Sequence, residues 1–296
     1  MIKKISDFLN RNINYVFIAP ALTILLGIVI YPLFYNFNLS FHEVTMLTFR
    51  AGDWEFVGLG NFIEVVTDTF FQRAFLRTVL FLICTVIGQV VIGLAGAMAF
   101  NVDFKGKKYI MPIALIPMMI TPIAVGLIWK MFLNSQWGIV NYLFNLVGLP
   151  ALNWLSEPYL AFISIVIVQI WWGVSFVLLV LLGGLSSLPQ TPFEAAKIDG
   201  ASKFQMFRYI TLPLLKPVIL IVIMLRSIDA FRVFDIIYAL TQGGPGHATR
   251  TFALELYYTA FERGEFGLGA AQALILAAVT LVLASGLINT LYTEEV

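Results

Sequence analysis

The stretch TPFEAAKIDGASKFQMFRYITLP, residues 191–213, holds five charged side chains, whereas residues 158–188 before it hold none. This polar stretch interrupts a chain of 296 residues that is 60% hydrophobic and only 12% charged. Soluble domains carry roughly 25% charged residues. Lipid is therefore the solvent for most of this chain, and the polar stretch is a segment outside the membrane.

Runs without Asp, Glu, Lys or Arg locate the membrane spans. A helix needs about 20 apolar residues to cross a bilayer, and five runs reach that length: 12–42, 78–102, 109–129, 158–188 and 266–293. A sixth span, about 214–240, is apolar but carries four charges. Backbone groups in hydrocarbon must bond within their own segment, so the sequence predicts an all-α polytopic membrane protein with six transmembrane helices.

Basic residues orient these spans. With the N-terminus inside, the internal segments hold Lys3, Lys4, Arg11, Lys105, Lys107, Lys108, Lys197, Lys203, Arg208 and Lys216. The opposite loop, 134–158, has no Lys or Arg. Because short cytoplasmic loops carry the excess of positive charge, we expect a multi-pass plasma-membrane protein with both termini and residues 191–213 in the cytoplasm.

The N-terminal part divides from the rest near residue 75. Residues 1–75 comprise an N-terminal segment, the first span and an external loop, and residues 76–296 comprise five spans. The first apolar run is too long for a cleaved signal peptide, and its A-x-A, Ala19 to Ala21, lies near its start, so we expect a retained helix. In the external loop, Phe62, Val66 and Phe70 recur every four residues, which fits a short interfacial helix or a plain connection. Cys84 is alone, so disulfides within the chain are excluded and its expected role is packing.

Residues 191–213 contain the signals of two short helices. Thr191 with Glu194 and Ser202 with Gln205 have the spacing of capping boxes, and Pro192 suits the first helical turn. Between them lies Asp199-Gly200-Ala201, where glycine can adopt the left-handed conformation that ends a helix. The sequence predicts a helix, a sharp turn and a second helix, a rigid elbow suited to docking a partner; a solvated loop capping two spans is the alternative.

The elbow also carries a resemblance. Glu194, Ala195, Ala196, Asp199, Gly200, Ala201 and Phe207, with the Leu212-Pro213 ending, resemble the EAA signature of permease subunits of ATP-binding-cassette importers. The strings FVGLGNF (56–62), IPMMITPIAVGLIWKMFLNSQWGIVN (116–141), WLSEP (154–158) and FDIIYALTQGGPGHAT (234–249) resemble its maltose-transporter-like, binding-protein-dependent carbohydrate-uptake branch.

The resemblance implies the type I ABC importer permease fold, with the coupling loop at 190–213 docked on an ATPase. It also implies a heterodimer with a second permease subunit, two copies of a cytoplasmic ATP-binding subunit that hold ATP-Mg, and an extracytoplasmic solute-binding protein. The cargo would be a di- or oligosaccharide, or a related polyol or glycerol phosphate. This chain would bind no cofactor, metal or nucleic acid itself.

Other classes fit less well. The chain has no G-x-x-x-x-G-K-[ST] phosphate loop, so an ATP-driven transporter needs separate ATPase chains. No catalytic constellation surrounds His42 or His247, the two histidines, so we expect no enzyme. The threefold P-x-[DE]-x-x-[KR] repeat of mitochondrial carriers is absent from the sequence. A six-helix secondary carrier that works without an ATPase remains the alternative.

Charges in the sixth run point to the transport path. Arg226, Asp229, Arg232 and Asp235 are spaced three residues apart with alternating sign, so each is expected to meet the next on a helix. Charges within a membrane face a bundle interior or a wet cavity. Two interpretations are equally open: an ion-pair ladder that locks helices, or a polar wall of the substrate cavity.

Further candidates for the substrate path come from the resemblance. Maltose-type permeases hold sugar near a proline of one span and at polar positions of the next two. The corresponding positions here are Met118, then Gln169 with Trp172 and Gly173, then Ala230 through Val233. Met118, Ala230 and Val233 offer no hydrogen bond to a sugar, so the contacts must differ in detail. Trp172 is the expected aromatic platform.

Overall fold

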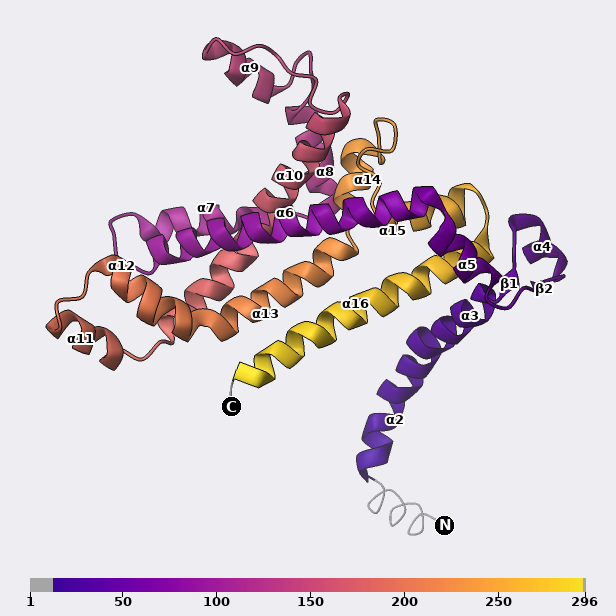
Figure 1. Ribbon diagram of the computed structural model, residues 1–296, viewed down its shortest axis with the longest axis horizontal. Helices are drawn as coiled ribbons and strands as arrows, with labels where there is room; N and C mark the ends of the chain where they lie inside the picture. The colour runs from indigo at the N-terminus through magenta and orange to yellow at the C-terminus, as the bar shows by residue number, and fades with distance from the viewer. Residues whose placement is uncertain (1–12, 295–296) are drawn as a thin grey trace. The chain divides into compact units, whose positions relative to one another are not determined.

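The computed structural model describes residues 13–294, and it is helical through most of that length (Figure 1). The chain forms two compact units, one of residues 1–68 with 256–275 and one of residues 69–255 with 276–296. Lys3, Lys4 and Arg11, which were used to predict the orientation of the first span, lie outside the described residues. The predicted division after residue 75 lies inside the first helix of the larger unit.

The smaller unit joins short helices with a two-stranded hairpin. Its first elements are α2 (Ile13–Leu25), η1 (Leu26–Ile30), α3 (Tyr31–Ser40), β1 (His42–Glu43), α4 (Met46–Ala51), β2 (Glu55–Phe56) and α5 (Gly60–Thr67). The strands are antiparallel, with His42 opposite Phe56. The buried Asn61 amide donates to the carbonyl oxygens of Ser40 and His42 at 2.9 Å. The Asn61 side chain thus provides a donor for two backbone carbonyls at the start of the hairpin.

The interfacial segment was predicted in part. Phe62 and Val66 do lie on a short helix, α5. Phe70 lies beyond a break at Asp68, on the long helix α6 (Thr69–Phe100). That helix begins well before the predicted span at residue 78, because residues 69–77 carry charges but no helix-breaking glycine or proline.

The larger unit is built on three long helices. Its elements are α6, α7 (Lys107–Met119), α8 (Pro122–Phe132), α9 (Ile139–Leu146), α10 (Pro158–Ser186), α11 (Thr191–Ile198), α12 (Lys203–Met206), η2 (Phe207–Thr211), α13 (Leu212–Phe231) and α14 (Asp235–Thr241). Near the chain's end follow α15 (Phe252–Tyr257), η3 (Tyr258–Glu262) and α16 (Phe266–Glu294); residues 256–275 of this stretch belong to the smaller unit. Helices α6, α10 and α13 pack against one another (Figure 1).

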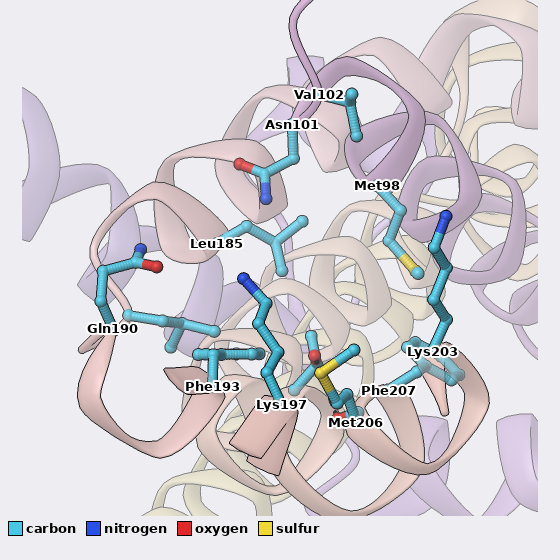
Figure 2. Close-up of a pocket in the computed structure, with 12 residues that line it drawn as sticks. Met98, Asn101, Val102, Leu185, Gln190, Phe193, Lys197, Lys203, Met206 and Phe207 are labelled. Atoms are coloured by element: carbon cyan, nitrogen blue, oxygen red, sulfur yellow. Dashed lines mark hydrogen bonds between the residues drawn. The ribbon is translucent and has the colours of Figure 1, made fainter. Parts of the chain in front are cut away.

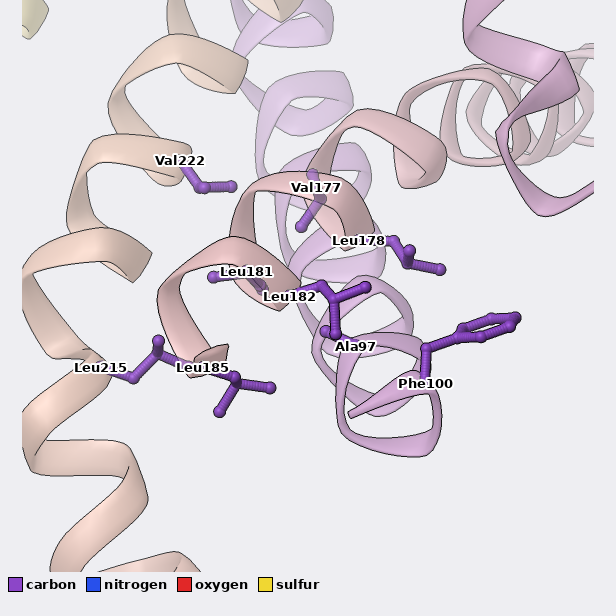
Figure 3. Packing of buried hydrophobic residues seen from close by; sticks show 9 residues of the cluster. All are labelled: Ala97, Phe100, Val177, Leu178, Leu181, Leu182, Leu185, Leu215 and Val222. Carbon is purple, nitrogen blue, oxygen red and sulfur yellow. The ribbon is translucent and has the colours of Figure 1, made fainter. Parts of the chain in front are cut away.

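Their shared core is aliphatic except for one phenylalanine. Figure 3 shows its buried members: Ala97 and Phe100 on α6, Val177, Leu178, Leu181, Leu182 and Leu185 on α10, and Leu215 and Val222 on α13. Small residues let these backbones approach closely, as is typical of helices in membranes. A Cβ at Gly93 would meet Val177 and the backbone nitrogen of Leu178, the latter at 3.3 Å. The core therefore fixes α6 and α10 in register.

Five described helices are long and apolar enough to cross a membrane, and a bent pair raises the number to six. They are Phe17–Ser40, Thr69–Phe100, Pro158–Ser186, Lys203–Phe231, Phe266–Gly286 and the pair Lys107–Met119 with Pro122–Phe132. The predicted number of spans is thus met by length and composition.

Two predicted spans differ from the structure in form. The run 109–129 was expected to be one helix, but α7 and α8 meet at a bend of 103°. Pro122 cannot donate a hydrogen bond to the turn before it, and Ile120 and Thr121 adopt extended conformations there. The predicted span 214–240 actually extends over Lys203–Phe231, and residues 235–241 form the separate helix α14.

Candidate functional site

The elbow at residues 191–213 has the predicted helix–turn–helix form. Glu194, Ala195 and Ala196 lie on α11, and Asp199 is the residue at its C-terminal cap. Gly200 follows with φ +76°, in the left-handed region. The amide of Ala201 donates to the carbonyl of Ala196 at 2.9 Å, and that of Gly200 to Lys197 at 3.2 Å. This pair of bonds is the Schellman motif that a C-terminal glycine favours, so the prediction of a left-handed Gly200 is confirmed.

One predicted capping box forms and the other does not. The Ser202 hydroxyl accepts from the Gln205 amide at 3.3 Å, and the Gln205 side chain accepts from the Ser202 amide at 2.7 Å. The predicted capping box of Thr191 with Glu194 was wrong. Gln190 already has helical φ and ψ, and its carbonyl accepts from Phe193 and Glu194 at 3.0 Å. Thr191 is therefore inside α11 rather than at its cap.

This contrast yields a prediction. Ser202→Ala should remove the hydrogen bond to the Gln205 backbone amide and weaken α12 locally by about 1 kcal/mol. This corresponds to roughly a fivefold rise in the equilibrium constant for opening of α12. Hydrogen exchange of the amides of residues 203–206 should quicken by about that factor. Thr191→Ala is the matched control, because Thr191 makes no capping bond, and exchange at the start of α11 should stay the same. Equal responses to the two changes would contradict the assignment of the caps.

A pocket of about 390 Å³ lies between the elbow and the ends of α6 and α10 (Figure 2). Phe193 and Phe207, from the two arms of the elbow, both line it, as does Leu185 of α10. The arms thus share apolar contacts with the spans, although α11 itself has no buried residue. Helix α11 is thus joined to α10 on one side and, through the Gly200 turn, to α12 on the other.

The break between α7 and α8 positions the second candidate region. The Trp172 indole on α10 donates to the Ile120 carbonyl at 3.0 Å, so a side chain satisfies an acceptor freed by the break. Ser175, three residues on, donates to the Ala114 carbonyl of α7 at 2.7 Å. Non-helical backbone at membrane depth is tolerated where protein or a wet cavity surrounds it. Helix α10 thus holds the broken span in place.

A buried arginine network joins α6, α10 and α13. Arg226, 3% exposed, donates to the Gln89 side chain at 2.8 Å and pairs with Asp229 at 3.2 Å. Gln89 in turn donates to the Gln169 backbone carbonyl at 2.8 Å. The guanidinium also lies 5.4 Å from the centre of the Trp172 ring, within cation–π range. One side chain therefore binds three helices together.

Gly173 is required by the same network. A Cβ at this position would meet the Gln89 side chain, and it would lie 2.5 Å from an Arg226 nitrogen. Because both neighbours are buried and held by hydrogen bonds, they have little freedom to shift. Gly173 thus permits the close approach of the Gln89–Arg226 pair to α10.

A cavity of about 320 Å³ lies beside this network. Its lining is Pro122, Gln169, Trp172, Asp229, Arg232, Val233, Phe234, Asp235 and Ile236. The size is at the lower end of the range of about 300–1,000 Å³ for small-molecule sites. The break before α8, the middle of α10 and the end of α13 therefore meet at one polar hollow.

The structure brings together most of the predicted substrate-path residues. Gln169, Trp172, Asp229, Arg232 and Asp235 line this cavity, whereas Met118 and Gly173 are not among its lining residues. Val233 of the predicted Ala230–Val233 segment lines it as well.

The predicted ladder of ion pairs was wrong at its last step. Asp229 pairs with both Arg226 and Arg232, the latter at 3.0 Å. Helix α13 ends at Phe231, and Asp235 begins α14, so the spacing of three residues no longer places Arg232 and Asp235 on one face. Within residues 13–294, the Asp235 carboxylate has no ion-pair or hydrogen-bond partner.

Gln89 is the residue that sequence reasoning missed. It stands alone as an amide in the run LICTVIGQVVIGLAG, residues 82–96. A polar side chain in the middle of a charge-free span is costly unless it is bonded. That signal was available, but the partner, Arg226, is 137 residues away in the chain, and spacing along the sequence does not reveal such a pair.

Comparison with known proteins agrees with this architecture. Residues 89–294 match the family described as "Binding-protein-dependent transport system inner membrane component". The chain is 39% identical over 265 residues to the trehalose/maltose transport system permease protein MalF of Thermococcus litoralis, covering 89% of this chain and 88% of that protein. It is 32% identical to the sulfoquinovosyl glycerol transport system permease protein SmoG of Agrobacterium fabrum, covering 98% and 93%.

Solved structures show the same fold. A chain of a bacterial ABC transporter involved in the import of the acidic polysaccharide alginate superposes with a TM-score of 0.83 at 21% identity, covering 98% of this chain and 99% of that one. The expected type I ABC importer permease fold is thus confirmed. This chain belongs to the binding-protein-dependent transport system inner membrane components, the permease subunits of ABC importers.

Proposed function

We propose that this permease is one of two different membrane subunits of an ATP-driven importer for a carbohydrate, a di- or oligosaccharide or a related polyol or glycerol phosphate. The observation that carries the proposal is the cavity lined by Gln169, Trp172 and three charged residues at the broken helix. Aromatic and hydrogen-bonding groups around a hollow suit a hydroxylated ligand. MalF of Thermococcus litoralis, named for trehalose and maltose transport, supports the same class.

The elbow is the proposed contact with the ATPase. Glu194, Ala195, Ala196, Asp199, Gly200, Ala201 and Phe207 would form or support the surface that seats in one of the two ATP-binding subunits. The observation that supports this role is an exposed helix, α11, held by a defined turn and lacking buried residues of its own. Two ATP-binding subunits with ATP-Mg, an extracytoplasmic solute-binding protein and cytoplasmic chain termini complete the proposed assembly. One solved alginate importer is in complex with a periplasmic protein.

Transport would follow from a shift between two conformations. ATP binding would close the ATPase subunits, pull on α11 and turn the cavity outward, and hydrolysis would reset it. Nucleotide drives such a switch only if it binds one state better than the other. A change from 1:99 to 99:1 needs about 5.5 kcal/mol of differential binding, which two bound nucleotides would share.

Copurification tests this assembly. The tagged chain, expressed with its genomic neighbours and extracted in mild detergent, should bring a second permease and an ATPase in stoichiometric amounts. An untagged preparation taken through the same column is the control. A lone chain that still transports sugar after reconstitution would show a secondary carrier and refute the proposal.

A further inference from the structure

We infer that the cavity beside α14 selects an uncharged, hydroxyl-rich ligand, and that Asp235 is the residue that excludes acidic saccharides. This inference rests on the proposed function and deepens it, because it adds the charge class of the cargo and a residue that sets it. It removes the glycerol phosphate alternative.

Two acceptors that line the cavity have no partner in the described chain. Asp235 lines it with an exposed carboxylate that has no partner within residues 13–294. Gln169 lines it too; it is 1% exposed, and its side-chain oxygen has no hydrogen-bond partner in the described chain. A buried acceptor without a partner is costly. A ligand that donates hydrogen bonds to both residues would remove that cost.

Two cations lie in or beside the cavity, and both pair with Asp229; the buried Nη2 of Arg226 has no hydrogen-bond partner in the described chain. Arg232, which lines it, pairs with Asp229 at 3.0 Å, and the buried Arg226 pairs with the same carboxylate at 3.2 Å. Arg226 further donates to Gln89. An anionic ligand at Arg232 would compete with Asp229 for that guanidinium, and it would face the unpaired Asp235 as a like charge.

Hydroxyl groups meet these demands without that loss. An ionised carboxylate only accepts hydrogen bonds, at two oxygens, so Asp235 can accept from two neighbouring hydroxyls of one sugar ring. The Trp172 indole nitrogen already donates to the Ile120 carbonyl, and the Arg226 guanidinium lies over the ring. Trp172 therefore offers the ligand ring surface rather than a donor. An uncharged polyhydroxylated ring is the ligand that uses all three groups.

Related importers do handle charged cargo, so the distinction is informative. SmoG is named for sulfoquinovosyl glycerol, and a structurally similar transporter for the acidic polysaccharide alginate. MalF of Thermococcus litoralis is named for trehalose and maltose. By the charges that line its cavity, this chain groups with the importers named for uncharged sugars.

Binding of matched sugars to the purified complex tests the inference. The complete detergent-purified complex, without the solute-binding protein, would be titrated with trehalose against trehalose 6-phosphate and with maltose against maltobionate. Omitting the solute-binding protein removes its own selectivity. In at least one pair we expect the uncharged sugar to bind at least tenfold more tightly than its acidic analogue.

One variant and its matched control test whether Asp235 causes the selectivity. Asp235→Asn keeps the size of the side chain and removes the charge, so it should reduce the preference for the uncharged sugar at least threefold. Asp103→Asn removes the same charge from an exposed loop residue and should leave the preference unchanged.

The outcomes separate the inference from the proposed function. A preference for the uncharged sugar below tenfold in both pairs, tighter binding of the acidic sugars, or an Asp235→Asn complex with unaltered preference would overturn the inference and leave the carbohydrate importer standing. A complex that binds no sugar of either kind, and whose uptake requires none, would overturn the carbohydrate assignment and the inference with it.

Discussion

Gly200→Val is expected to abolish ATP-driven uptake while leaving the sugar affinity of the solute-binding protein unchanged. Gly200 has φ +76°, a conformation that costs an L-residue roughly 1–2 kcal/mol and a β-branched residue more. No atom lies within 4 Å of an added Cβ, so the penalty comes from the backbone and not from a clash. The turn would open, and α11 would lose its fixed direction relative to α12.

A second substitution at the same position isolates the cause. Asparagine tolerates the left-handed region far better than valine, and space for its side chain is open. Gly200→Asn should therefore retain most of the uptake. The measurement is initial uptake and ATP hydrolysis of the reconstituted complex, with comparable amounts of each variant in the membrane. Normal coupling in Gly200→Val would show that the elbow does not transmit the ATPase motion.

Arg226→Met should destabilise the permease far more than Arg232→Met. Arg226 has a side chain only 4% exposed, and its removal leaves Gln89 without its donor and Asp229 with one partner fewer. Breaking a buried, hydrogen-bonded charge pair typically costs about 3–5 kcal/mol. Arg232 is 63% exposed, and an exposed pair contributes only about 0–1 kcal/mol. The two arginines bond the same carboxylate, and they differ in burial and in the bond of Arg226 to Gln89.

Thermal unfolding of the detergent-purified complex, followed by fluorescence-detected gel filtration, measures this difference. Arg226→Met should lower the melting temperature by several degrees or prevent assembly, and Arg232→Met should change it little. Gln89→Leu should lose part of the same stability. Equal melting temperatures for the two arginine variants would show that Arg226 is not the anchor of α6, α10 and α13.

Local signals predicted the elbow well and long-range contacts poorly. The Ser202–Gln205 box and the left-handed Gly200 depend on residues within a few positions of one another, and both form. Thr191 has the same spacing to Glu194, but the helix starts at a different residue. A capping pattern defines a possible helix start, while the preceding backbone decides which residue occupies it.

The candidate cavity depended on features that sequence spacing misrepresents. Assuming one continuous helix across 214–240 put Asp235 in line with Arg232, yet the chain turns after Phe231. The run 109–129 was expected to be one helix, so neither the bend of 103° nor the Trp172 bond that supports it was predicted. Gln169 and Trp172 were found only through resemblance. Spatial convergence of α8, α10 and α14 could not be read from their order in the chain.

The most direct test of the central claim is ATP hydrolysis by the complete complex in proteoliposomes, measured with and without sugar-loaded solute-binding protein. A permease whose elbow couples transport to ATP should show hydrolysis that the loaded binding protein stimulates, and Gly200→Val should remove the stimulation. The account would be contradicted if this chain alone concentrated sugar in ATP-free liposomes, or if Gly200→Val left stimulation and uptake at the level of the unaltered complex.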